Sequence, residues 1–262
     1  MTLKNGTSLR QLTSGRRGLL AGAVALLATG SPSRTSTAAP RPLNAYFHKG
    51  KGAVSMLGNP EHGAEQAAMT GVFAGGRVTI DLESGREAFL RQLFASDFAY
   101  LSLHANQRLV VVGNGDRVTT AELEAARRAA GRVPRLVIVA GCKTTGAALD
   151  ADNVPQALGF ASGARKQAYI GFHTLVVGIS QDRYFRYFLP LWVNPGPGGA
   201  YRTLAQARTD AKELMERRYQ LMKDGAAGGQ QAGAALRMSP LDLKVTGNFD
   251  IVGDEDLRAT DL

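Results

Sequence analysis

The stretch LVIVAGC at residues 136–142 decides the fold that we expect for this chain. Its first five residues are all apolar, and three of them are β-branched. Short runs of this kind are typical of a strand that is buried on both faces of a parallel sheet. The run ends in Gly141, which is followed by Cys142, the single cysteine of the chain. We therefore expect a central strand with a thiol at its carboxyl end.

Apolar strands and helices alternate on both sides of this segment. Asn114 and Gly115 favour a hairpin turn between two short strands, and Thr119 with Glu122 forms a capping box that opens a helix. We expect a loop over 49–63, helices over 85–94, 119–131, 153–161 and 201–223 and after Ser180, and extended segments at 44–48, 72–73, 77–82, 98–103, 136–140, 168–172 and 241–252. This alternation predicts an α/β fold, a three-layer α/β/α sandwich with a mainly parallel central sheet.

The N-terminal segment indicates export. Residues 1–38 hold five basic residues and no acid, and an uncharged run of 13 residues, 18–30, follows Arg16 and Arg17. This run is too short to span a bilayer, which takes roughly 20 apolar residues, but it matches the apolar core of a signal peptide. The paired arginines resemble the twin-arginine export signal of bacteria. We expect a periplasmic or extracellular protein without an integral membrane segment once the signal is removed.

Length and composition set the remaining expectations. The 262 residues allow one large domain or two small ones, and we expect a signal over 1–39, one α/β domain over 42–255 and a tail over 256–262. Beyond residue 38 there are 26 basic and 22 acidic residues, an excess too small to indicate a nucleic-acid partner. One cysteine excludes an internal disulfide framework and any multi-cysteine metal site. His48, His62 and His173 lack metal-binding spacing, so we expect no metal and no cofactor.

Two reactive side chains stand where predicted core strands end. His104 follows the strand at 98–103, and Cys142 follows the strand at 136–140. Sites in open α/β sheets gather at the carboxyl ends of strands, so parallel neighbours would bring both residues to one rim. There the imidazole could take the proton of the thiol and activate it as a nucleophile. The alternative is that Cys142 is a buried small residue and that His104 is an ordinary hydrogen-bonded histidine.

The order of these elements resembles the caspase-like fold of clan CD cysteine peptidases, nearest to the bacterial CHAT and gingipain-like branches. In those families one strand ends in His, and a later strand ends in a small residue and the nucleophilic Cys. Here LSLHA at 101–105, VAGCKTTG at 139–146 and SGAR at 162–165 occupy those places, and GNFD at 247–250 resembles a terminal turn of the fold. The resemblance covers about residues 86–255.

The resemblance implies a role for each of three residues. Cys142 would be the nucleophile and His104 the base, and the backbone N–H groups of Cys142 and Ala105 would hold the oxyanion. Ala105 stands where these families usually have glycine, and alanine keeps the N–H while limiting the backbone angle φ.

The resulting hypothesis is an exported cysteine endopeptidase that hydrolyses peptide bonds of a peptide or protein substrate through Cys142 and His104. Gly141, His173 and Asp182 would border the substrate pocket, with His173 an alternative base and the carboxylate of Asp182 favouring a basic side chain. Asp182 could instead stabilise the first turn of a helix. Two further alternatives are another thiol-dependent amidohydrolase and a non-catalytic exported binding or scaffold protein that keeps a caspase-like shell.

The export signal gives the first testable prediction. The intact chain should mature outside the cytoplasm to a start near residue 39 or 40, because small residues at 36–39 follow the apolar run. Replacing Arg16 and Arg17 by lysine should block this maturation if the twin-arginine route is used. N-terminal sequencing of the exported protein checks both points, and unchanged export of the double variant would leave only a general signal peptide.

Overall fold

The computed structural model describes residues 43–145, 152–161, 163–227 and 238–262. All of them belong to one compact unit, Ala39–Leu262. The expected signal over 1–39 lies outside the described residues, as do Gly146 and Ser162 of the quoted motifs.

A six-stranded sheet forms the centre of the fold. Its strand order is β2-β1-β3-β7-β8-β9. The first five strands run parallel, and β9 pairs antiparallel with β8 at the edge. The strands are β1 (Asn44–Lys49), β2 (Arg77–Asp81), β3 (Phe98–Ser102), β7 (Leu136–Ala140), β8 (Ala168–Phe172) and β9 (Phe249–Gly253). Every residue of β7 is buried, so the expected central strand is confirmed.

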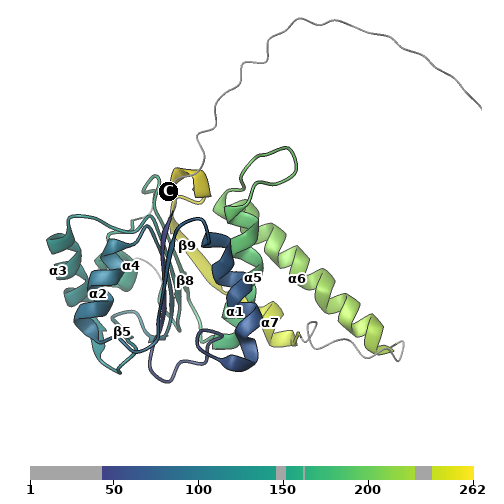
Figure 1. Ribbon diagram of the computed structural model, residues 1–262, viewed down its shortest axis with the longest axis horizontal. Coiled ribbons are helices and arrows are strands. Elements are labelled where there is room, and N and C mark those ends of the chain that lie inside the picture. Colours follow the sequence, from purple (N-terminus) through teal and green to yellow (C-terminus); the bar gives the residue numbers. More distant parts are fainter. Residues whose placement is uncertain (1–42, 146–151, 162, 228–237) are drawn as a thin grey trace, which may run out of the picture. The chain divides into compact units, whose positions relative to one another are not determined.

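Helices cover both faces of this sheet (Figure 1). Val137 and Val139 of β7 pack with α2 (Arg86–Ala95), α3 (Thr120–Ala130) and α4 (Val154–Ala157) on one face. Leu136 and Ile138 pack on the other face with α1 (Gly63–Thr70), α5 (Gly178–Val193), α6 (Leu204–Ala227) and α7 (Pro240–Val245). Alternate side chains of the strand therefore enter two separate cores, which confirms the expected three-layer sandwich.

A second, antiparallel sheet follows directly after β3. It consists of β4 (His104–Ala105), β5 (Leu109–Val111) and β6 (Arg117–Thr119). The expected hairpin and capping box are both present, with Thr119 N–H donating to the Glu122 carboxylate at 2.8 Å. This small sheet matters for function because it fixes the backbone of His104.

Several expected elements differ from the structure. Only the end of the loop expected over 49–63 differs, because Pro60–His62 form a 3-10 turn that leads into the unexpected helix α1. The extended piece expected at 72–73 is instead part of a 3-10 turn, Gly71–Phe73. Helix α4 ends at Ala157, earlier than expected, and α5 begins at Gly178, before Ser180. Residues 241–252 are not one strand, because Pro240 at the first helical turn and a Ser239–Asp242 capping box begin α7 there.

The expected tail over 256–262 is part of the fold. Leu257 and Ala259 are buried, and the carbonyl of Leu257 accepts a hydrogen bond of 3.1 Å from the indole N–H of Trp192. Thr203 forms an isolated antiparallel bridge with Arg258. The apolar residues of this short segment cover the core beside α5, so it packs instead of extending into solvent.

A buried histidine joins β1 to its surroundings. His48 is fully buried, and its Nε2 accepts a hydrogen bond of 3.1 Å from the N–H of Gly113, in the turn between β5 and β6. Its Nδ1 must therefore carry the ring proton, and it lies 3.2 Å from Oδ2 of Asp81 on β2. Tyr46 donates to the same oxygen at 2.7 Å. Burial lowers the pKa of His48 and outweighs the opposing effect of Asp81, so the imidazole is neutral and this contact is a hydrogen bond.

The His48 cluster gives a pH prediction. The native imidazole resists protonation, which would break its bond to Gly113, whereas an unfolded histidine takes up a proton near pH 6.5. The unfolded state thus binds more protons below pH 6.5, and the free energy of unfolding should fall as the pH decreases from there. Urea unfolding at pH 8 and pH 5 measures this change. His48→Gln should remove most of it and His62→Gln should not; an equal pH dependence in His48→Gln would refute the assignment.

Candidate active site

The carboxyl ends of β3 and β7 lie side by side. The two strands are parallel neighbours, with Ser102 opposite Ala140, and the N–H of Leu103 donates to the carbonyl of Ala140 at 3.3 Å. This confirms the predicted pairing of the strands at 98–103 and 136–140. His104 is two residues after Ser102, and Cys142 is two residues after Ala140. Because Ser102 and Ala140 lie opposite each other, both side chains leave the sheet at the same edge.

Gly141 permits the close approach of these two chain segments. A Cβ atom at this position would lie 2.9 Å from the carbonyl oxygen of Leu103 and 2.9 Å from Cβ of Ala105. Any larger residue would push the segment with His104 away from the segment with Cys142. Gly141 was expected to border the substrate pocket, and in the structure its small size is required by the packing of the two strand ends on each other.

His104 is exposed on strand β4. Its Nε2 lies beside the glycine-containing loop after β1, where a Cβ atom at Gly52 would be only 3.6 Å away. Gly52 has a φ of 71°, in the left-handed region that favours glycine. Within the part of the chain that the structure describes, no hydrogen bond holds the His104 ring, so both ring nitrogens are available for proton transfer. Sequence reasoning did not identify Gly52 as a neighbour of His104.

Cys142 is partly buried at the start of a sharp turn. Its Sγ lies 3.8 Å from the carbonyl oxygen of Val176, in the loop after β8. Lys143 has a φ of 53°, which is uncommon for a residue other than glycine, and its N–H donates to the carbonyl of Thr174 at 3.1 Å. Thr144 accepts from the N–H of Phe172 at 3.0 Å. The chain therefore turns at the thiol and is fastened to the end of β8.

His173 directly follows β8 and lies near the turn after Cys142, whereas His104 follows β3. Its Nδ1 is 3.2 Å from Oδ2 of Asp250 on β9, and Thr145 donates to the same oxygen at 2.7 Å. The carboxylate thus orients the imidazole, whose side chain is 39% exposed. The sequence motif at 247–250 indicates only a turn at Asp250, because its pairing with His173 depends on the position of β9, which the sequence does not reveal.

Asp182 differs from the expectation. It lies inside α5 rather than in the preceding loop, and its side chain is fully buried. Its carboxyl group accepts hydrogen bonds from the hydroxyl of Ser55, the N–H of Met56 and the hydroxyl of Tyr100. Burial raises the pKa of this carboxyl, while the hydrogen bonds oppose the rise. Its oxygen atoms are occupied inside the protein, so Asp182 does not present a charge to a substrate.

Exposed apolar residues lie in the chain segments next to the thiol. Leu175 and Val177 flank the Val176 carbonyl that contacts Sγ, and they are 72% and 45% exposed. Val54 is 59% exposed, and its carbonyl oxygen packs so closely on Gly178 that a Cβ atom there would lie 1.8 Å away. We call Val54, Leu175 and Val177 the apolar rim. Exposed apolar side chains grouped in this way mark interaction surfaces.

The described residues contain no group of three or more His, Cys, Asp and Glu side chains that could hold a metal ion. In the same residues no helix is both long enough and apolar enough to cross a membrane.

Comparison with known proteins identifies the fold. No protein-family model matches the chain, and no curated protein matches its sequence. The structure of gingipain R (RgpB), an Arg-specific cysteine proteinase, matches with a TM-score of 0.57 at 10% identity over 82% of this chain and 46% of that one. A complex of Porphyromonas gingivalis RgpB pro- and mature domains matches with a TM-score of 0.55 at 10% identity, over 83% and 48% of the chains.

The Drosophila initiator caspase Dronc matches more weakly, at a TM-score of 0.35 and 9% identity over 67% of this chain and 74% of its own. The fold is caspase-like, as expected from the sequence. At 10% identity the likeness concerns the fold alone, and the chain spans about half the length of the gingipain structures that it matches.

The position of Asp182 gives a prediction that separates a structural role from a role in specificity. Asp182→Ala should leave three buried donors without an acceptor, and each such donor costs about 1–3 kcal/mol. We expect the free energy of unfolding, measured in urea, to fall by about 3 kcal/mol or more. Glu213→Ala, which removes an exposed carboxylate, should change it by less than about 0.5 kcal/mol. A loss of under about 1 kcal/mol in Asp182→Ala would contradict the structural role.

Proposed function

We propose that this chain is a cysteine peptidase in which Cys142 attacks the substrate and His104 acts as its base. The observation that carries the proposal is the contact between the two strand ends, which brings an exposed imidazole and a thiol to one edge of a parallel sheet. The caspase-like fold supports it, because the gingipain structures of the same fold are cysteine proteinases. The arginine pair and apolar run at 16–30 support our further proposal that the protein is exported.

In the proposed reaction His104 takes the proton of the Cys142 thiol as sulfur forms a bond with the carbonyl carbon of the scissile peptide. The C–N bond then breaks, and His104 returns the proton to the leaving amine. Water, deprotonated by the same imidazole, attacks the thioester. The C–S bond breaks, the acid product leaves, and the thiol regains its proton.

The N–H groups of Ala105 and Cys142 are the proposed oxyanion donors. Asn106 donates its N–H to the carbonyl of Leu109 at 3.0 Å across the β4–β5 ladder. Backbone N–H groups alternate in direction along an antiparallel strand, so that of Ala105 points away from β5. The Cβ of Ala105 also lies close to Gly141. This N–H is therefore free of the ladder and next to the segment that carries the nucleophile, as stabilisation of a tetrahedral intermediate requires.

The apolar rim favours a substrate with an apolar side chain near the scissile bond. Leu175 and Val177 flank Val176, whose carbonyl oxygen lies near the thiol, and the carbonyl of Val54 in the loop after β1 packs on Gly178. A basic substrate residue would lose hydration against this surface, and the buried Asp182 would not compensate by pairing with its charge. Lys143, exposed directly after the nucleophile, adds a positive charge that repels such a residue further.

The test uses peptide probes with an electrophilic carbon that reacts with an activated thiol. A probe carrying leucine should label Cys142 of the purified protein faster than matched probes carrying arginine or aspartate. Cys142→Ala should abolish labelling, and His104→Ala should slow it by about 100-fold or more, since a positioned base contributes at least that much. His173→Ala is the matched control and should retain labelling. Mass spectrometry locates the modified residue.

Each other outcome contradicts a defined part of the proposal. A folded protein that no probe labels would favour the non-catalytic scaffold protein. Labelling that depends on His173 but not on His104 would move the base to the β8 side of the thiol. Labelling without hydrolysis of any peptide, but with hydrolysis of small amides, would favour another thiol-dependent amidohydrolase.

A further inference from the structure

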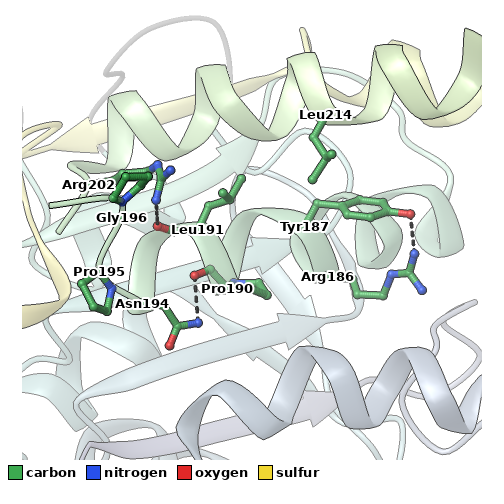
Figure 2. Close-up of a pocket in the computed structure, with 10 residues that line it drawn as sticks. Arg186, Tyr187, Pro190, Leu191, Asn194, Pro195, Gly196, Arg202 and Leu214 are labelled. Atoms are coloured by element: carbon green, nitrogen blue, oxygen red, sulfur yellow. Dashed lines mark hydrogen bonds between the residues drawn. The ribbon is translucent and has the colours of Figure 1, made fainter. Parts of the chain in front are cut away.

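A concave site lies between α5 and α6, at the C-terminal half of α5 (Figure 2). Its volume is about 310 Å³, at the lower end of the range of pockets that take small molecules. Its apolar wall consists of Tyr187, Pro190, Leu191, Pro195, Pro197 and Leu214. The three prolines have no N–H group, so this part of the wall offers a ligand rigid apolar surface and few donors.

One end of the pocket is lined by Arg186, and Arg218, one helical turn beyond the lining residue Leu214 on α6, contacts the lining residue Tyr187 there. Arg186 donates to the hydroxyl of Tyr187, and Arg218 of α6 lies 3.4 Å from the same oxygen. Both guanidinium groups lie over the tyrosine ring, with their carbons 4.6 and 5.0 Å from its centroid. Among the residues that the structure describes, no carboxylate pairs with either arginine. Two guanidinium groups that converge on one neutral oxygen form a natural site for an anion.

The other end of the pocket is electrically balanced. Arg202 pairs with Asp210 of α6 at 2.5 Å, and it also lies 3.4 Å from the carbonyl of Leu191. The side-chain amide of Asn194 donates to the carbonyl of Pro190 at 3.0 Å. Figure 2 shows Arg186 and Tyr187 at one end of the pocket and Asn194, Pro195 and Arg202 at the other. Residues 186 and 194 are eight positions apart, which is about 12 Å along a helix.

We infer that this pocket binds a small amphiphilic carboxylate. The carboxylate would lie between Arg186 and Arg218, beside the hydroxyl of Tyr187, where it would neutralise the two unpaired charges. The hydrocarbon part would extend along Pro190 and Leu214 toward the balanced end. The charge asymmetry of the pocket fixes this orientation, and the short span between its ends limits the ligand to a chain of moderate length.

Octanoate is a suitable probe, and octanamide and acetate are its matched controls. Octanamide keeps the chain and loses the charge, whereas acetate keeps the charge and loses the chain. Binding to the full chain is measured by calorimetry and by the fluorescence of Trp192, the single tryptophan, which is buried in α5 beside the lining residue Leu191. We expect saturable binding of octanoate. Octanamide should bind more weakly by about tenfold or more because it loses a charged hydrogen bond, and acetate should bind more weakly by at least as much because it loses the buried hydrocarbon chain.

Variants test the location of the site. The double variant Arg186→Gln/Arg218→Gln should bind octanoate about tenfold more weakly or worse, and Leu214→Phe should block binding by filling the pocket. Arg217→Gln, which removes the neighbouring exposed arginine, should change nothing. Thermal melting shows whether each variant is folded. Absence of saturable octanoate binding, equal binding of octanamide, or unchanged binding in the double variant or in Leu214→Phe would each overturn the inference.

Discussion

The parallel pairing of β3 with β7, and the close contact that it requires at Gly141, determines where the candidate catalytic groups lie. The register places Ser102 opposite Ala140, so the residues that follow leave the sheet together. Beyond that point β4 pairs with β5, whereas the segment after Cys142 is bonded to the end of β8. The imidazole and the thiol therefore lie where two parallel strands separate, and parallel sheets commonly place their sites there.

The sequence was sufficient to predict those helices and strands that are indicated by residues close together in the chain. The apolar run at 136–140 identified the central strand, and Thr119 with Glu122 marked the start of α3. The alternation of strands and helices was enough to predict the layered architecture and a rim that carries His104 and Cys142. Each of these features depends on residues within a few positions of one another, or on the general rule that parallel strands share an edge.

Features that depend on distant partners could not be predicted in the same way. Asp182 follows Ser180 by two residues and has the position of an ordinary helix-start acid, but its hydrogen bonds come from Ser55 and Tyr100, which are 127 and 82 residues away. The partner of His173 is Asp250, 77 residues away on the antiparallel edge strand. The positively charged end of the pocket between α5 and α6 likewise arises only where two helices meet, because Arg186 and Arg218 are far apart in sequence.

The hydrogen bonds of Asp182 also have a consequence for the loop that borders the proposed catalytic site. Ser55 and Met56 follow Val54 of the apolar rim directly, and the carboxyl group fastens them to α5 and, through Tyr100, to β3. The loop is thus held in place by the carboxyl group of Asp182, which the sequence alone suggests would bind a basic side chain of the substrate. The loop that carries Val54 loses its conformational entropy when the protein folds. A peptide that binds against Val54 would therefore spend little of its binding free energy on ordering this loop.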